Sequence, residues 1–310
     1  MITATDISGR FWNLPQKADE ETARETTFID DIIQKTHIER EILSNLDGIR
    51  TVFDGGAGYG RFSILLAKLG LRVTHFDISE VMISKAKELA AEAGVTDNMT
   101  FIHGSLEDLS AYSDRQFDLV LSFDAPISYT YPRHEEVIGN LMRICSKRLI
   151  IGVYSRLGWE TYPFNPVQKS KYILDNTSNA PLVQWYLESE AKSRSGFKPN
   201  IDFVRSLSTS GLMENPETVA VEYEKGGTPW PVSYSFMPDE LQGLLERFGA
   251  KSVKLAGPGA LSRSIPGEVL RNIMRDKELR EDFLSFCYDY DRNIYVCGMG
   301  KDNVVATAEL

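Results

Sequence analysis

A turn crowded with glycines lies between two short patterned segments near the start of the chain. Arg50–Asp54 has the length of a short strand, and Tyr59–Leu69 has the spacing of a helix. The turn between them contains Gly55, Gly56, Gly58 and Gly60. Glycine has no Cβ, so the backbone can turn sharply and approach a ligand closely. The helix that follows offers free N–H groups at its first turn. This pattern predicts a strand–loop–helix unit that binds a ligand through its backbone.

Strands and helices alternate after this turn. Further strands are predicted at Arg72–Asp77, Met99–His103, Phe117–Phe123 and Arg148–Tyr154, with helices at Glu80–Ala93 and Glu135–Cys145. Five strands that alternate with helices are typical of a parallel, doubly wound sheet. Late strands are predicted at Lys251–Ala256, Ile294–Gly298 and Asn303–Thr307, the last two joined by a hairpin turn. The predicted fold is therefore α/β, doubly wound, with a mostly parallel seven-stranded sheet and an antiparallel edge strand.

Two regions lie outside this alternation. Residues 1–46 are predicted to form an N-terminal helical cover, whose clearest helical spacing is at Thr27–Leu46, with a polar gap at Gln34–His37. Residues 156–216 are too long for an ordinary connection. We interpret them as an inserted cap after the fifth strand, so that residues 47–155 and 217–310 form the core.

The rest of the chain shows weaker patterns. Helices are expected near Val167–Leu174 and Leu182–Ser193 and at Pro238–Phe248 and Gly267–Tyr290, and extended segments at Val219–Tyr223 and Val232–Phe236. The cap also contributes a set of aromatic residues that suggests an apolar pocket or packing onto the core. They are Trp159, Tyr162, Phe164, Trp185, Tyr186 and Phe197.

The glycine turn does not match the two best-known phosphate-binding patterns. A P-loop requires Gly-Lys followed by Ser or Thr, and Arg61-Phe62 stands in that place. The dinucleotide pattern GxGxxG also fails. Counting from Gly56 the third glycine position is Arg61, and counting from Gly58 it is Ser63.

The run VFDGGAGYGRF resembles motif I of the class I S-adenosylmethionine-dependent methyltransferases. Asp77 ends the second strand about 20 residues later, where a carboxylate can accept both ribose hydroxyls of a nucleotide. Its alternative role is to cap the helix that follows. The segment from His103 to Leu109 resembles the family segment beside the adenine, and Phe117–Asp124 resembles its fourth strand, whose end faces the methyl group.

The resemblance implies S-adenosyl-L-methionine as cofactor and S-adenosyl-L-homocysteine as product. Asp54 would serve the amino-acid end of the cofactor or only stabilise the loop, and the acceptor of the adenine amino group stays open among Ser105, Leu106 and Glu107. The residues expected to bind the cofactor are Asp54, Gly55, Gly56, Gly58, Asp77, Ile78, Ser105, Leu106 and Phe123.

Three polar residues beyond the fourth strand are candidates for catalysis. Asp124, Tyr129 and His134 stand at the expected mouth of the site, where each can accept a proton or orient an acceptor. Histidine titrates near neutral pH and suits general-base work. The alternative for His134 is contact with local backbone or solvent.

The net charge of the chain limits the classes of molecule that it is expected to bind. A formal net charge of −10 disfavours a nucleic-acid backbone. We therefore expect a small-molecule acceptor, methylated on O, N or C, and no nucleic-acid partner. An RNA or protein methyltransferase and a non-catalytic cofactor-binding module are the alternatives. A homodimer is possible.

The three cysteines are scattered and form no CxxC pair, and the four histidines form no HExxH motif, so we expect no metal site. The sequence shows neither a signal peptide nor a membrane-spanning segment, and we therefore expect a cytoplasmic protein.

Overall fold

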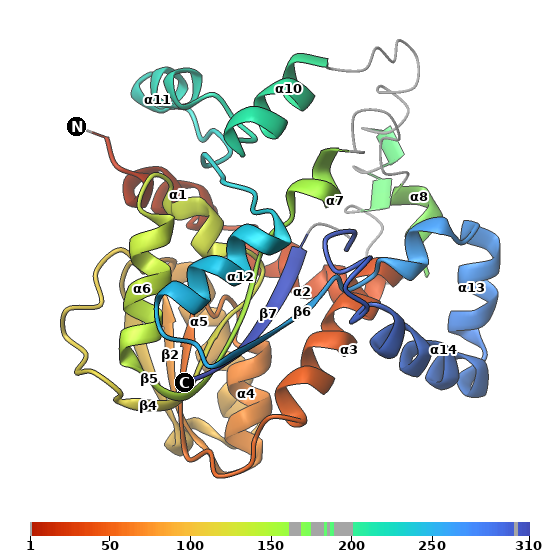
Figure 1. Cartoon of the computed structure of the whole chain (residues 1–310), viewed down its shortest axis with the longest axis horizontal. Coiled ribbons are helices and arrows are strands. Elements are labelled where there is room, and N and C mark those ends of the chain that lie inside the picture. The colour runs from red at the N-terminus through yellow and green to blue at the C-terminus, as the bar shows by residue number, and fades with distance from the viewer. Residues whose placement is uncertain (1, 161–168, 175–182, 185–186, 189–200, 301–302) are drawn as a thin grey trace.

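The computed structural model describes residues 2–160, 169–174, 183–184, 187–188, 201–300 and 303–310. Within these residues, seven strands form one sheet in the order β3-β2-β1-β4-β5-β7-β6 (Figure 1). The strands are β1 Thr51–Gly55, β2 Arg72–Asp77, β3 Met99–His103, β4 Phe117–Ser122, β5 Cys145–Tyr154, β6 Ser252–Ala256 and β7 Asn303–Glu309.

The first five strands of the sheet pair in parallel, as predicted. β7 lies between β5 and β6 and is antiparallel to both; its register on β5 runs from Arg148↔Glu309 to Tyr154↔Asn303. The antiparallel pairing therefore lies at one edge region of a mostly parallel sheet. This arrangement confirms the predicted fold class.

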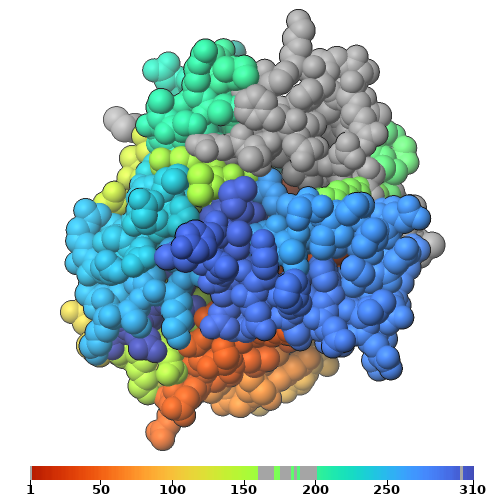
Figure 2. Space-filling model, turned by 45° about the vertical axis from the view of Figure 1, so that its right-hand side comes forward, coloured from red at the N-terminus to blue at the C-terminus, as the bar shows by residue number. Residues whose placement is uncertain are grey.

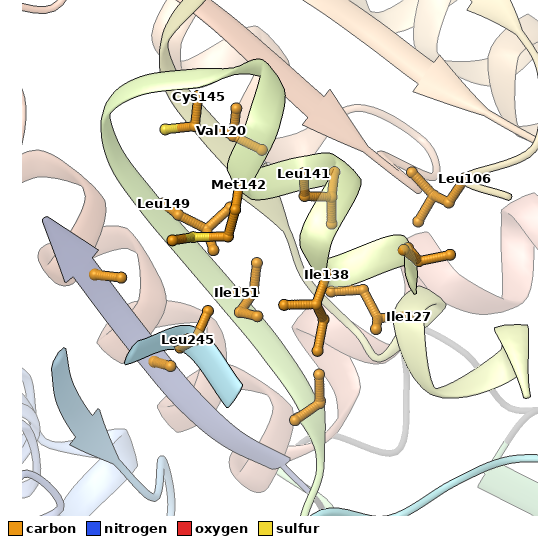
Figure 3. Packing of buried hydrophobic residues seen from close by; sticks show 14 of the residues in the cluster. Leu106, Val120, Ile127, Ile138, Leu141, Met142, Cys145, Leu149, Ile151 and Leu245 are labelled. Carbon is orange, nitrogen blue, oxygen red and sulfur yellow. The ribbon is translucent and has the colours of Figure 1, made fainter. Parts of the chain in front are cut away.

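Helices cover both faces of the sheet. On one face lie α3 (Ile29–Leu43), α4 (Arg61–Lys68) and α5 (Glu80–Glu92); on the other lie α6 (His134–Ile144) and α12 (Pro238–Arg247). Neighbouring strand residues alternate between the two cores: Leu119 and Leu121 pack with the first set of helices, and Val120 packs with the second. Such alternation is the period-two geometry of a strand. Figure 3 shows α6 side chains packed against β4 and β5.

Two helices precede α3 in a stretch of mixed, mostly polar sequence. α1 (Ala4–Trp12) begins with a capping box, in which Thr3 and Asp6 bond to each other's backbone N–H. This reciprocal cap satisfies two donors of the first turn. α2 (Lys17–Thr27) follows, and Phe28 separates it from α3.

Further helices lie around the sheet. α7 (Arg156–Glu160), α10 (Ile201–Ser210) and α11 (Pro216–Glu224) are at the end where the parallel strands finish, together with α1 (Figure 1). α13 (Gly267–Arg275) and α14 (Lys277–Tyr290), in blue, form one flank of the molecule (Figure 2). Short elements are α8 (Lys169–Tyr172), η1 (Thr96–Asn98), η2 (Pro126–Thr130) and η3 (Leu261–Ser264).

Two predicted segments are wrong. Val219–Tyr223 belongs to helix α11, because Asn215 accepts hydrogen bonds from the N–H groups of Glu217 and Thr218 and Pro216 starts the helix. Ile294–Gly298 forms turns instead of a strand, so the predicted hairpin with the last strand does not exist.

Three other segments differ in detail. The predicted helix Gly267–Tyr290 is divided at Asp276, which caps α14. Val232–Phe236 is extended but makes only isolated bridges. Most of the predicted helix Leu182–Ser193 and the start of Val167–Leu174 lie outside the described residues.

Ile138 tests the core between α6 and the sheet. Its side chain is fully buried, so Ile138→Ala should lower the free energy of unfolding by about 2–5 kcal/mol in urea denaturation. Ile294 is 75% exposed, and Ile294→Ala should change the same quantity by less than about 0.5 kcal/mol. Equal losses in the two variants would contradict this assignment of the core.

Candidate functional site

A cavity opens at the carboxyl ends of the parallel strands, the edge at which ligands bind in open α/β sheets. It holds about 1010 Å³ of empty space, including its open mouth. One wall is made by the glycine loop and the segments that follow β2, β3 and β4. The opposite wall is made by residues of α1, α2 and α3.

The glycine loop forms part of this wall because its backbone is left-handed. Gly56 and Gly58 have φ values of +68° and +56°, which favour glycine. A Cβ on Gly56 would lie 2.4 Å from Pro126, whereas one on Gly58 would meet no atom within 4 Å. Gly56 thus permits close packing of the wall, and Gly58 leaves its backbone open to the cavity.

Gly55 does not line the cavity, in contrast to its prediction as a cofactor contact. A Cβ there would lie 2.8 Å from the Phe53 ring and 2.9 Å from Leu106. The absence of a side chain at Gly55 therefore serves packing behind the loop.

Two buried carboxylates line the cavity, and both were predicted from the sequence. Asp54, in β1, accepts a hydrogen bond from Ser63 Oγ at 2.6 Å. Asp77, at the end of β2, accepts from Gly58 N at 2.7 Å and from Ser79 N at 2.8 Å. Burial raises the pKa of each carboxyl to about 6, because desolvation disfavours the charged form. A cationic or hydroxyl-bearing ligand would compensate this cost.

Asp77 contributes only partly to capping helix α5. The N-cap of α5 is Ser79, whose Oγ accepts from Met82 N at 3.2 Å. Asp77 instead accepts hydrogen bonds from the backbone of the glycine loop, at Gly58, and from the start of α5, at Ser79. Each carboxylate oxygen still has a second lone pair with which it can bind a ligand.

The remaining predicted cofactor contacts also line the cavity. They are Ile78, Ser105, Leu106 and Phe123. Ser105 Oγ lies 2.8 Å from Thr5 Oγ1, and Thr5 also donates to Glu107. The segment after β3 is therefore tied to helix α1.

Helix α1 closes one side of the cavity. Thr5, Ser8 and Trp12 face it, and Ser79 Oγ donates to the Trp12 carbonyl at 2.8 Å. Ser8 Oγ is buried and has no hydrogen-bond partner among the described residues, so it can serve a polar ligand. Arg10 fixes the helix by donating to the Tyr223 carbonyl at 2.8 Å. Only the tertiary contacts identify Thr5 and Ser8 as part of the site.

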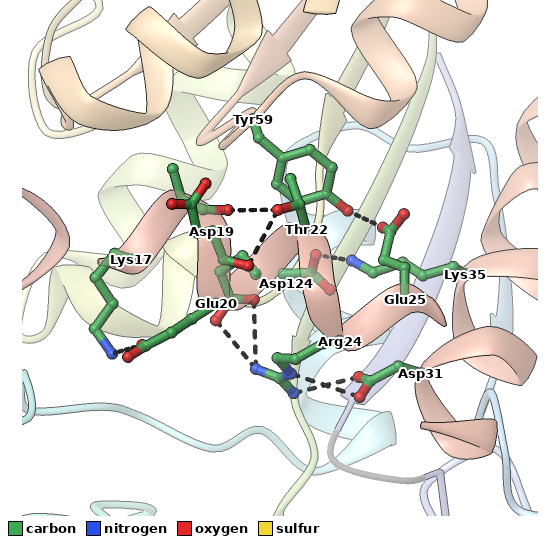
Figure 4. A network of polar contacts seen from close by, with 12 residues as sticks. Lys17, Asp19, Glu20, Thr22, Arg24, Glu25, Asp31, Lys35, Tyr59 and Asp124 are labelled. Atoms are coloured by element: carbon green, nitrogen blue, oxygen red, sulfur yellow. Dashed lines mark hydrogen bonds and ion pairs between the residues drawn. The ribbon is translucent and has the colours of Figure 1, made fainter. Parts of the chain in front are cut away.

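A polar network lies where α2 and α3 meet the glycine loop (Figure 4). Glu25 accepts from Tyr59 and Arg61 of the loop region, and Lys35 is paired with Asp124. Lys35 lines the cavity and is only 7% exposed. Burial lowers the pKa of Lys35 to about 8 and raises that of Glu25. The sequence signal for Lys35 was the polar gap at Gln34–His37 in an otherwise apolar helix face.

Two predicted catalytic residues line the cavity. Asp124 and its neighbour Ala125 both have φ of +64°, an uncommon conformation for non-glycine residues that concentrates at functional sites. Tyr129 bonds through its hydroxyl to the hydroxyl of Tyr154. Burial raises the pKa of Tyr129 well above its usual value, so the phenol stays protonated and does not act as a base.

His134 is not placed in the cavity, and its predicted role as a general base is not supported. Its ring stacks on Tyr234 with centroids 4.1 Å apart, beside Phe236. Burial lowers the pKa of His134. The residue begins α6 and packs between that helix and the extended segment 232–236, which is a structural role.

Of the six aromatic residues singled out in the cap, only Trp159 lies within the described residues. It packs on Tyr154 with ring centroids 5.7 Å apart and does not line the cavity. Tyr162, Phe164, Trp185, Tyr186 and Phe197 lie outside the described residues.

Solved structures share this fold. The chain aligns over its whole length with phosphoethanolamine N-methyltransferase 2 of Haemonchus contortus, at a TM-score of 0.54 and 13% identity, covering 60% of that chain. It also aligns over its whole length with the cyclase SpnF, at a TM-score of 0.55 and 14% identity, covering 97% of that chain. The sheet order and the cavity at its carboxyl edge define a class I, Rossmann-like methyltransferase fold.

Sequence comparisons identify the family of the core. Residues 52–148 match the family model described as "Methyltransferase domain". Residues 52–148 of this chain therefore form a methyltransferase domain. The match contains β1 to β4, the glycine loop and both buried carboxylates of the cavity.

Two curated relatives match shorter segments. The tRNA 5-carboxymethoxyuridine methyltransferase of Escherichia coli is 40% identical over 70 residues, which is 23% of this chain and 27% of the relative. The magnesium-protoporphyrin O-methyltransferase of Synechocystis is 34% identical over 108 residues, which is 34% of this chain and 45% of the relative. The matches thus span less than half of either relative.

Asp54→Asn tests how the buried carboxylate affects the stability of the fold. The folded-state pKa is raised, so the charged form is disfavoured by folding and the energetic cost grows as pH rises through about 6. Asp54→Asn should therefore raise the free energy of unfolding at pH 7.5 by about 1–3 kcal/mol, and the gain should vanish by pH 4. Urea denaturation at both pH values measures it.

The matched control for this substitution is Asp97→Asn. Asp97 is exposed in η1, at the opposite end of the sheet from the cavity, and its replacement should change stability by less than about 0.5 kcal/mol. A loss of stability in Asp54→Asn at pH 7.5 would contradict the account of an uncompensated buried carboxylate.

Proposed function

We propose that this chain is an S-adenosylmethionine-dependent methyltransferase that acts on a small-molecule acceptor, with O, N or C as the methylated atom. The observation that carries the proposal is the cavity itself. A methyltransferase domain places two buried carboxylates and an open glycine backbone at the carboxyl edge of its sheet. S-adenosylmethionine carries two cationic groups and a ribose diol, which match these carboxylates.

The cavity residues fit the cofactor along its length. Asp77 would accept the ribose hydroxyls, Asp54 would face the amino-acid end, and the backbone at Gly56 and Gly58 would approach that end. The apolar residues Ile78 and Leu106, which line the cavity beside the Ser105 segment, would flank the adenine. When bound, the cofactor supplies an electrophilic methyl group on its sulfonium.

The protein residues around the acceptor would orient it and exclude water. Methyl transfer needs in-line placement of two ligands, so proximity supplies much of the acceleration. Tyr129 would donate a hydrogen bond to the acceptor, because its phenol stays protonated. Asp124, whose side chain is 48% exposed at the mouth, is the carboxylate available to take a proton from it.

Charge supports a small acceptor over a polyanion. The chain has a net charge of −10. The cavity wall is net negative as well, because five carboxylates, those of Glu21, Asp54, Asp77, Glu107 and Asp124, outnumber the two basic side chains of Lys35 and Arg61. Such a wall repels the phosphates that dominate nucleic-acid binding. The specific observation that favours the alternative, an RNA acceptor, is the segment 40% identical to the tRNA methyltransferase of Escherichia coli.

The division of the chain and its location stay proposals. We propose that residues 1–46 cover the site, that 47–155 and 217–310 form the core, and that 156–216 form the cap on the acceptor side. Contacts of α1 with the cavity support the first part. The three cysteines are buried and unpaired, which supports a cytoplasmic location. No helix in the described part is long and apolar enough to cross a bilayer. A homodimer stays a prediction.

Calorimetry with S-adenosylhomocysteine tests cofactor binding. Asp77→Asn should weaken binding by about 10- to 100-fold, because a carboxylate that accepts from the ligand is lost. Asp97→Asn is the matched control and should bind like the unmodified chain. Absence of binding to the unmodified chain would refute the proposed function.

Transfer of a labelled methyl group distinguishes the acceptors. Incubation with labelled S-adenosylmethionine and either a small-molecule cell extract or bulk RNA should label a product in the small-molecule fraction. Label in RNA alone would favour the alternative. Cofactor binding without label in any fraction, protein included, would indicate a non-catalytic binding module.

A further inference from the structure

A buried lysine, Lys35, lines the cavity and is not among the proposed cofactor contacts. Lys35 Nζ comes from α3 and is paired with the Asp124 carboxylate beyond β4, across the mouth of the cavity. An ammonium group this well buried costs several kcal/mol unless a carboxylate accompanies it. Asp124 is the carboxylate that pairs with Lys35, and the Asp124 side chain is itself about half exposed.

Lys35 lies at the same end of the cavity as Asp54. Its Nζ is 5.7 Å from the centroid of the Phe62 ring, in the first turn of α4. The next residue, Ser63, donates to Asp54 at 2.6 Å. The charge of Lys35 also acts on Asp54. One carboxylate and one ammonium thus face this end of the cavity from opposite walls.

Opposite charges on two walls complement a zwitterion. A free α-amino acid group carries an ammonium and a carboxylate on one carbon, and the cofactor of the proposed function ends in such a group. We propose that Lys35 binds the α-carboxylate of this group while Asp54 faces its α-ammonium, with Asp124 exchanging its place on Lys35 for the ligand. This inference rests on the proposed function.

The exchange is balanced in charge. Lys35 keeps one carboxylate partner throughout, first that of Asp124 and then that of the ligand, so the buried ammonium is never left alone. The released Asp124 side chain, about half exposed, regains water at low cost. It then becomes the free carboxylate at the acceptor mouth, which makes acceptor binding follow cofactor binding.

Several other charged groups face Lys35 and set its titration. They are Glu21 and Glu25 of α2, Asp31 of α3, Asp54 of β1, Arg61 of α4 and Asp124 after β4. Burial lowers the pKa of Lys35 to about 8. A ligand carboxylate binds the protonated form, so the affinity for the amino-acid group should fall as pH rises through about 8.

The test compares two ligands that differ in the amino-acid group. S-adenosylhomocysteine contains it, and 5′-methylthioadenosine does not. Calorimetry on Lys35→Met should show about 10- to 100-fold weaker binding of S-adenosylhomocysteine and unchanged binding of 5′-methylthioadenosine. Unchanged binding of the second ligand also shows that the variant is folded. Lys35→Arg should recover part of the lost affinity.

Two further measurements sharpen the test. The ratio of the two affinities should fall with pH through about 8 in the unmodified chain and change less in Lys35→Met. Asp124→Asn should bind S-adenosylhomocysteine at least as tightly as the unmodified chain, because it removes the competing carboxylate.

Three results would overturn the inference. Lys35→Met could bind S-adenosylhomocysteine normally, which would leave the lysine to the acceptor while the proposed function stands. It could lose both ligands equally, which would make the lysine structural. Asp124→Asn could lose S-adenosylhomocysteine as Lys35→Met does, which would make the ion pair itself structural. If the unmodified chain bound neither ligand, the proposed function would fail instead.

Discussion

The carboxylate of Asp77 is the contact on which the geometry of the site depends. It accepts hydrogen bonds from Gly58 N and Ser79 N, so it joins the end of β2 to the glycine loop and to the start of α5. Two more loop N–H groups, those of Gly56 and Ala57, donate to the Phe76 carbonyl at 2.7 and 3.1 Å. A buried backbone donor left without a partner is costly. These bonds therefore hold the loop in the one shape that leaves Gly58 open to a ligand.

The same site contains buried ionisable side chains whose charged forms lower the stability of the fold and can bind a charged ligand. Asp54 and Asp77 both have a pKa raised to about 6 by burial, and Lys35 has one lowered to about 8. Each shift reports an unfavourable burial of the charged form. Such groups cluster at functional sites more than in structural cores. The cavity is thus arranged for a ligand that brings charges of both signs, and this pattern agrees with the methyltransferase domain without depending on it.

The strands of the core follow from local sequence patterns, whereas segments with competing local signals fold otherwise than these patterns predict. β4 was predicted from its continuous apolar run, which is typical of a strand buried on both faces, and the other parallel strands from their alternation with helices. Val219–Tyr223 reads as extended from its β-branched residues, yet the cap at Asn215 and the proline after it make a helix. Ile294 and Tyr295 also favour a strand, but both are exposed in turns and β7 pairs with β5 and β6 instead. Pairing partners far away in sequence decided these cases.

By itself the sequence determined the loop at Asp54–Gly60, the carboxylate at Asp77 and the alternation of strands with helices. Each of these features is visible in a short stretch of sequence. Successive parallel strands end at the same edge of the sheet, so the last residues of these strands come together without further information. The tertiary structure alone decided that Lys35 and Ser8 face the cavity and that His134 does not. Helices α1 and α3 reach the site by packing over the strand ends, and His134 is withdrawn by stacking on Tyr234. No spacing in the chain encodes such contacts, since they depend on how distant helices pack.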